Sequence, residues 1–341
     1  MAVAAILKFI FGKRENNTNP HTGAVRSVNE DAADTQLVIE PEKLTYKNSQ
    51  KLFLKYLFDD GKTRTVTVPQ KLVIETVLDN LKKKENRIHA IPRLPTVIPK
   101  LLRSLRDPDS SVKDYVNLVI KDPVLSAAVL KLANSAYFNP ISTRIEDIDK
   151  AIVKLGTEGL RSVLSAAVMQ PIIQRESPYF SQTGQKLWLH SLNCAVACEI
   201  MATERRLDKF KLYLIGLMHD IGKITLFSEL CKQFKLNGTN DMPGFYAFAP
   251  AVAKYSTALS YHICKDWELP EEICNAVYEQ IQIRPGVPAS AYAKILFEAN
   301  IACEKYAVTQ TEERETLFEQ LYPLKLPKNL FEALDRVSTE L

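Results

Sequence analysis

Residues 214–226 read LIGLMHDIGKITL, and this stretch decides the fold class. Apolar side chains fill most positions on both sides of a short polar group, which consists of His219, Asp220 and Lys223. The apolar residues recur at the three- and four-residue spacing of a helix, and the alternation of a strand is missing. The stretch therefore predicts a buried helix that ends near His219 and Asp220.

The polar group at this helix end has the chemistry of a metal site. An adjacent imidazole and carboxylate can bind one ion together, and they suit Zn, Mn, Fe or Mg in differing degrees. His190, in LWLHSL on the preceding long helix, reaches the same point if the two helices are antiparallel. Gly222 lets another backbone or a ligand approach closely, and Lys223 can face a phosphate as a point charge.

The same residues also fit an arrangement that binds no metal. Buried ionisable groups need hydrogen-bond partners, so His190, His219 and Asp220 also fit a buried polar cluster that holds no metal. Lone lysines are usually exposed, which predicts that Lys223 is a solvated helix residue. We expect the cluster without a metal or other cofactor, and a single divalent cation is the alternative.

Helical spacing of apolar residues continues from residue 71 onward, as in KLVIETVLDNLKKK and VLSAAVLKLANSA. Asp122 and Pro123 precede the second of these segments, with the acid at the N-cap and the proline in the first turn. The sequence therefore predicts an α-helical bundle over residues 71–310 and further helices over 311–341.

The N-terminal part has a different composition. Residues from about 14 to 36 are polar and rich in Asn, and we expect residues 1–35 to form a partly disordered arm. QLVIE and KLFLKYLFDDGKTRTVTV then predict strands, with Asp60-Gly61 in a tight hairpin turn. We expect a small β-module over residues 36–70 that serves a structural or dimerising purpose.

The overall composition excludes several classes of protein. The chain has 341 residues, of which 46% are hydrophobic, and its net charge of +4 gives no field that would attract nucleic acid. Its six cysteines form no C-x-x-C pair, so reduced thiols are expected. The apolar run at the start is too short for a bilayer and is followed by Lys13 and Arg14, so we expect a cytoplasmic protein without a transmembrane segment.

The constellation around His219 resembles the metal site of the HD phosphohydrolase superfamily. That site has a His, then an adjoining His-Asp pair, then a distant Asp, and the first three match His190, His219 and Asp220. At the fourth position the resemblance points to Asn300, in AKILFEANIACEKYA. An amide oxygen brings no negative charge, so metal affinity is expected to suffer.

A second resemblance covers more of the chain. Residues 91–175 look throughout like the N-terminal half of an HDOD domain, with LANSAYF at 132–138 and AIVKLGTEGLR at 151–161 as markers. WELPEEICNAV, at 267–277, resembles a later element of that family. The resemblance implies an all-α, multi-helix HDOD fold with a core over about 91–285.

The chain also departs from the pattern of this family. Ser256 and Gln280-Ile281 stand where relatives often carry further histidines, and Asn139 stands where a glycine is frequent. Fewer histidines mean fewer ligands for a centre of two or three metals, and no GYP motif is found. The resemblance thus implies a degenerate site made of His190, His219, Asp220, Lys223 and Asn300.

The resemblance implies a non-catalytic regulator in bacterial signalling. We expect its HD-like half to keep a ligand-sized pocket for a nucleotide-type small molecule, and its N-terminal half to contact a protein partner in trans. Asn134, Tyr137 and Phe138 are candidates for a recognition groove, although close packing explains them as well. The alternative function is a metal-dependent phosphohydrolase, and nucleic-acid binding is not supported by any basic helix with interleaved aromatic residues.

Overall fold

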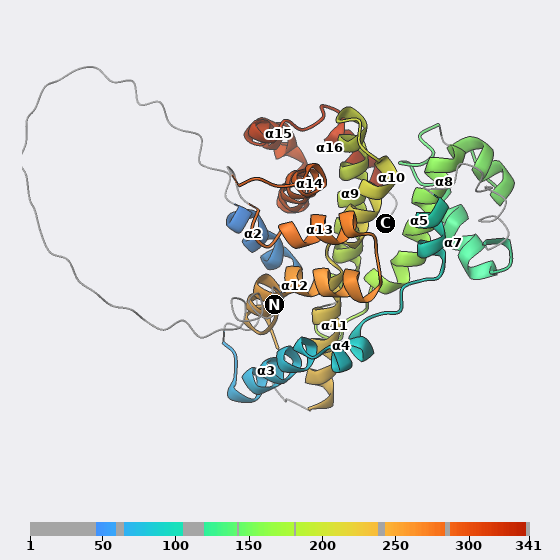
Figure 1. The fold of residues 1–341 in the computed structure, drawn as a ribbon. Coiled ribbons are helices and arrows are strands. Elements are labelled where there is room, and N and C mark those ends of the chain that lie inside the picture. Colours follow the sequence, from blue (N-terminus) through green and yellow to red (C-terminus); the bar gives the residue numbers. More distant parts are fainter. Residues whose placement is uncertain are drawn as a thin grey trace, which may run out of the picture. The chain divides into compact units, whose positions relative to one another are not determined.

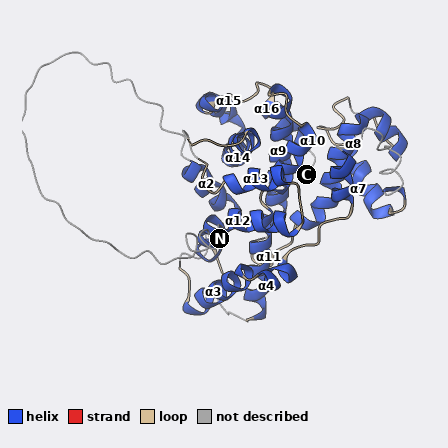
Figure 2. Ribbon diagram, in the orientation of Figure 1, coloured by secondary structure: helices blue, strands red, loops and turns tan. Residues whose placement is uncertain are grey.

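The structure is a computed structural model, and its described residues belong to one compact unit, Leu44–Leu341. It describes residues 46–58, 65–104, 119–141, 143–180, 182–237, 243–283 and 287–338. Within these ranges all regular structure is helical and no strand occurs (Figure 2). The expected all-α fold is confirmed, whereas the predicted arm at 1–35 lies outside the described residues.

Figure 1 shows the helices coloured in chain order, from blue to red. In chain order the α-helices are α2 Tyr46–Phe58, α3 Val68–Lys82, α4 Lys84–Ala90, α5 Val97–Ser104, α7 Pro123–Ala133, α8 Ile148–Ile173, α9 Thr183–Glu204, α10 Lys209–Met218, α11 Ile221–Leu236, α12 Phe245–Asp266, α13 Glu271–Glu279, α14 Ala291–Val308, α15 Arg314–Gln320 and α16 Leu330–Ser338. Two 3₁₀ turns, Thr311–Glu313 and Tyr322–Leu324, flank α15.

Helix α9 forms the centre of the core. It lies among the other helices (Figure 1) and contacts α2, α8, α10, α14 and α16. Buried side chains occur on all of its faces. A helix that is apolar all round is stable only in such an interior position. Gly216 on α10 permits the close approach of α10, because a Cβ at this position would lie 2.4 Å from the carbonyl oxygen of Cys194 on α9.

The prediction of a β-module at 36–70 is wrong for the residues that the structure describes. The segment KLFLKYLF lies in α2, and residues 68–70 begin α3. Short apolar runs fit a strand or a helix equally well, and tertiary contacts decide between them. Here Phe53, Leu54, Leu57 and Phe58 are buried at helical spacing while Lys51 and Lys55 stay exposed. The proposed turn at Asp60-Gly61 lies outside the described residues.

Helices α7 and α8 pack together in the N-terminal half of the bundle. As predicted, Asp122 caps α7, and its carboxylate accepts hydrogen bonds from the backbone N–H groups of Val124 and Leu125. Helix α8 is kinked at Gly156, whose φ of +65° is a conformation that other residues rarely adopt.

None of the described helices has the length and apolar character needed to cross a lipid bilayer.

Candidate functional site

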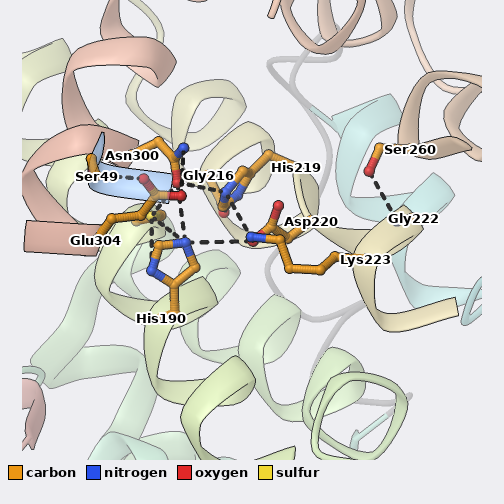
Figure 3. A network of polar contacts seen from close by, with 11 residues as sticks. Ser49, His190, Gly216, His219, Asp220, Gly222, Lys223, Ser260, Asn300 and Glu304 are labelled. Atoms are coloured by element: carbon orange, nitrogen blue, oxygen red, sulfur yellow. Dashed lines mark hydrogen bonds and ion pairs between the residues drawn. The ribbon is translucent and has the colours of Figure 1, made fainter. Parts of the chain in front are cut away.

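The side chains singled out by the sequence lie together at the centre of the bundle (Figure 3). His190 comes from the middle of α9 and Asn300 from α14, which packs beside it. Helix α10 ends at its C-cap His219, and the next residue, Asp220, is the N-cap of α11. The sharp junction between these two helices therefore presents His219 and Asp220 to the same point as His190.

Asn300 joins the two imidazoles. Its Oδ1 lies 3.1 Å from His190 Nε2 and 3.2 Å from His219 Nε2. Asp220 Oδ2 lies 3.5 Å from each of the same nitrogens. All four residues are buried, so the polar groups satisfy one another without bulk water.

The ring of His219 is held in a fixed orientation. Its Nδ1 lies 2.7 Å from the carbonyl oxygen of Gly216, one turn earlier, and this contact turns Nε2 toward Asn300 and Asp220. Metal-binding histidines are commonly oriented by such a contact. A metal ion at Nε2 would have to displace the contact with Asn300.

Lys223 is buried, and the expectation of a solvated residue is wrong. Only 2% of its surface is exposed, and its Nζ lies 2.6 Å from Asp220 Oδ2 and 5.0 Å from the centre of the Phe53 ring. Burial alone would raise the pKa of Asp220, but the interactions with the neighbouring His219, Lys223 and His190 together outweigh it and lower the pKa. Asp220 is thus a carboxylate whose charge is balanced by an ammonium group.

Desolvation lowers the pKa of His190, whereas it raises that of Asp220. Complete burial lowers the pKa of His190 well below its ordinary value, and the nearby Lys223 adds to this effect against the attraction of Asp220. His190 is therefore a neutral imidazole at physiological pH. Its ring stacks on Phe53, with 4.3 Å between the ring centres.

Two residues that the sequence reasoning missed complete the network. Glu304, one turn after Asn300 on α14, accepts a hydrogen bond of 2.7 Å from Ser49 Oγ on α2 and faces Asn300 Nδ2 at 3.5 Å. Burial raises the pKa of Glu304 to about 7. The spacing of four residues to Asn300 was a signal for Glu304, whereas Ser49 lies too far away in the sequence to be found.

The space left beside these groups is small. The cavity has a volume of about 20 Å³ and is lined by Gln50, His219, Asp220, Lys223, Ser256, Thr257, Val277, Gln280, Asn300 and Glu304. Such a space admits about one water molecule or one small ion. The expected ligand-sized pocket is therefore absent at this site.

A match to a known family accounts for this architecture. A model of the HDOD domain family matches residues 91–283, which is more than half of the chain. The protein belongs to the HDOD family.

A further relative is distant in sequence from this chain. An uncharacterized protein from Treponema pallidum (strain Nichols) is 24% identical over 224 residues, which cover 64% of this chain and 43% of the relative. The matched region thus spans less than half of that relative.

Solved structures show the same HDOD fold. An HDOD domain protein of unknown function from Geobacter sulfurreducens has 19% identity and a TM-score of 0.55, with 80% of this chain and 98% of that chain covered. A proposed metal-dependent phosphohydrolase from Shewanella amazonensis SB2B has 19% identity and a TM-score of 0.57, with 80% and 99% covered. At this level of identity the likeness concerns the fold.

Two of the departures from the HDOD pattern lie at the cavity. Ser256 and Gln280, which occupy places where relatives often have histidines, both line it. The Gln280 amide donates hydrogen bonds to the carbonyl oxygens of Ala276 and Ala293, at 3.0 and 2.9 Å. The amide nitrogen of Gln280 is thus already hydrogen-bonded to backbone carbonyl groups.

The predicted close approach at Gly222 is confirmed. A Cβ at this position would lie 2.2 Å from the carbonyl oxygen of Ser256 on α12, and the Gly222 N–H donates to Ser260 Oγ at 2.9 Å. This contact seats the start of α11 against α12, and so helps to place Asp220 and Lys223.

The donor groups of this HDOD site can be tested for their fit to a metal. His190, Cys194 and His219 offer ligand atoms that lie within 4.8 Å of one another. Burial raises the pKa of Cys194 well above its ordinary value, so the residue is a thiol rather than the thiolate that metals bind. The nearest carboxylate, Asp220, is already paired with Lys223. The set therefore supplies little negative charge to a divalent cation.

The candidate groove residues lie in the other half of the HDOD domain. Asn134 donates to the carbonyl oxygens of Leu130 and Ile145 and accepts from the Ile145 N–H, so its amide is used within the fold. Tyr137 packs edge-to-face on Phe138 and donates a hydrogen bond to Glu199 on α9. Partner binding at this place remains a prediction.

Proposed function

We propose that this HDOD protein is a non-catalytic regulator in signal transduction, which acts by binding a ligand or a protein. The observation that carries the proposal is the contact of 2.6 Å between Lys223 Nζ and Asp220 Oδ2. The ammonium group is paired with the carboxylate that would hold a metal cation in a hydrolytic site, and it balances the charge of that carboxylate.

The charge balance around Asp220 supports this proposal. Asn300 contributes an amide in place of a second carboxylate, and His190 is neutral. A divalent cation added to this group would face the ammonium of Lys223 in a buried environment, where repulsion between like charges is strong. Asp220 is already paired with that ammonium, and burial raises the pKa of Glu304, the other carboxyl group at the cavity, to about 7, so the two acids compensate little for the repulsion.

The size of the cavity supports the same conclusion. A space of about 20 Å³ has no room for a phosphoester, and Phe53 of α2 covers His190. Hydrolysis would require this helix to move. A fold that keeps its site closed is suited to binding partners through its outer surfaces, and a protein partner in trans remains our expectation.

A metal-dependent phosphohydrolase is the second candidate. The observation in its favour is the contact between His219 Nδ1 and Gly216 O at 2.7 Å, because it orients Nε2 as in a metal ligand. In that function His190, His219 and Asp220 would hold the ion, which would supply an activated water.

Metal content and phosphoesterase activity of the purified full-length chain discriminate between these functions. We expect substoichiometric Mn, Fe and Zn by mass spectrometry, and no turnover of nucleotide and aryl phosphoesters with or without added Mn²⁺. A stoichiometric metal, together with turnover that disappears in Asp220→Ala, would overturn the proposal.

The variant Asn300→Asp tests the role of charge directly. It restores a second carboxylate at the place where it is missing, so its affinity for Mn²⁺ by calorimetry should exceed that of the wild type by about tenfold or more. Asn237→Asp makes the same chemical change at an exposed position and should leave the affinity unchanged. Wild-type affinity equal to that of Asn300→Asp would contradict our explanation.

A further inference from the structure

A larger hollow lies further along α11, and its lining residues differ from those of the buried site. Its volume is about 680 Å³, within the range of about 300–1,000 Å³ that is usual for small-molecule sites. It is lined by residues from the segment after α4, the segment between α8 and α9, and one face of α11: Ala90, Ile91, Pro92, Arg175, Glu176, Ser177, Pro178, Thr225, Ser228, Cys231, Lys232 and Lys235. We call it the α11 groove.

The floor of the α11 groove carries hydroxyl groups that lack partners. Thr225 is 2% exposed, and its Oγ1 has no hydrogen-bond partner among the described residues. The Oγ of Ser228, one turn further along α11, likewise has none within the described part of the chain. Both oxygen atoms are themselves buried, so they lie beneath the surface of the groove.

Three cations stand around these hydroxyls. Arg175, Lys232 and Lys235 line the groove with exposed side chains, and the lining includes one acid, Glu176. Lys232 has a neighbour in Glu229 at 3.5 Å, whereas no acidic group of the described residues lies within 4.0 Å of Arg175 or Lys235. The electrostatic field in the groove therefore favours an anion.

The position of Arg175 is set by the fold. A Cβ on Gly184, at the start of α9, would lie 1.9 Å from the Arg175 carbonyl oxygen, so the two backbones touch. The Arg175 side chain also donates through Nε to the carbonyl oxygen of Ile172 at 3.1 Å. A guanidinium anchored in this way loses less freedom on binding an anion than a free side chain does.

The remaining wall of the α11 groove is apolar, and contacts with α12 and the residue that follows it hold this wall in place. Ile91 and Pro92 line it, and the carbonyl oxygen of Pro92 accepts a hydrogen bond of 3.1 Å from Trp267. The preceding helix is held by an ion pair of 2.9 Å between Arg87 and Asp266, both largely buried. An apolar wall opposite a cationic wall suits a molecule that has an anionic end and an apolar or planar end.

We propose that the α11 groove binds a small organic phosphate, with its phosphate near Arg175, Lys232 and Lys235 and its organic part against Ile91 and Pro92. No residue lines both this groove and the cavity at His190. The proposal therefore holds whether or not the buried site binds a metal.

Calorimetry with the full-length chain tests the groove. The probes are ADP and glucose 6-phosphate, with adenosine and glucose as their uncharged counterparts and a short acidic peptide as a third kind of anion. We expect saturable binding of at least one phosphate-bearing probe and none of its uncharged counterpart. Binding of the peptide alone, or no binding of either phosphate, would overturn the proposal.

Two variants and a matched control locate the binding. The double substitution Lys232→Gln/Lys235→Gln should weaken binding of the phosphate probe by about tenfold or more, since two charge-assisted contacts are lost. Arg175→Gln, which removes the anchored guanidinium, should weaken it by about threefold or more. Lys254→Gln/Lys328→Gln removes the same charge from exposed positions elsewhere and should leave affinity unchanged. Equal effects of the two double variants would exclude the groove as the site.

Discussion

Lys223 Nζ and Asp220 Oδ2 form a buried ion pair at 2.6 Å in the first turn of α11. The charges around Asp220 lower its pKa, and the attraction of Asp220 outweighs the effect of burial on Lys223 and raises the pKa of the lysine. Both groups are thus charged at neutral pH. The stabilisation that Asp220 contributes is present above its ordinary pKa of 3.8 and is lost only as pH falls below that value.

Breaking this ion pair should be costly. Lys223→Met leaves the Asp220 carboxylate buried without a cation, and the free energy of unfolding should fall by about 3–5 kcal/mol at pH 7. Urea denaturation measures the change. The double variant Lys223→Met/Asp220→Asn should recover part of the loss, because it also removes the unpaired charge. A loss below about 1 kcal/mol in the single variant would show that the pair is unimportant.

Phe53 should act as the cover of the site. Phe53→Ala removes a fully buried ring from His190 and Lys223, and should cost about 3–5 kcal/mol. Water then reaches His190, so the pKa of its imidazole should rise toward the ordinary value, as followed by NMR titration. Leu52→Ala, at a position that is 38% exposed on the same helix, should change neither quantity appreciably. An unchanged His190 titration in Phe53→Ala would refute the covering role.

Glu199 should make stability depend on pH. Burial raises the pKa of Glu199 from 4.5 to about 7, against hydrogen bonds from Tyr137 and Ser162 that lower it. The folded protein then binds a proton that the unfolded chain has lost, so stability falls as pH rises from about 4.5 to 7. The loss should amount to about 2–3 kcal/mol.

Glu199→Gln isolates this contribution. The amide imitates the protonated carboxyl group, so the variant should lose less stability than the wild type in urea unfolding at pH 5 and pH 8. Glu204→Gln, at an exposed position on α9, should follow the wild type. Parallel curves for wild type and Glu199→Gln would show that Glu199 ionises without cost.

Gly222 should tolerate no side chain. In Gly222→Ala the new Cβ meets the carbonyl oxygen of Ser256 at 2.2 Å, so α11 and α12 must separate and at least about 2 kcal/mol should be lost. Gly156→Ala provides a comparison, because no atom lies within 4 Å and the positive φ alone should cost about 1–2 kcal/mol. A milder effect at Gly222 than at Gly156 would contradict the close contact as its cause.

Local signals in the sequence were sufficient for most helices and for part of the site. The cap at Asp122, the helix junction at His219 and the place of Gly222 all follow from neighbouring residues. Lys223 was misjudged, although its spacing of three residues from Asp220 at a helix start is typical of an ion pair. The general tendency of lysines to be exposed does not indicate whether the surrounding turn is buried, and here the whole turn is buried.

The error at α2 had a different cause. The run KLFLKYLF is rich in residues that suit strands, and nothing within it specifies a helix. Its state is decided by contacts with α9, α12 and α14, which lie far along the chain. Ser49 and Phe53 were missed as site residues for the same reason.

The part that α2 and α14 take in the network means that the buried site extends beyond the segment that defines the HDOD family. Phe53 precedes residue 91, and Asn300 and Glu304 follow residue 283. A fragment cut at those two limits would keep both histidines yet expose them to solvent, stripped of their cover and of the amide between them. Measurements on such a fragment would describe an artificial cleft rather than this protein.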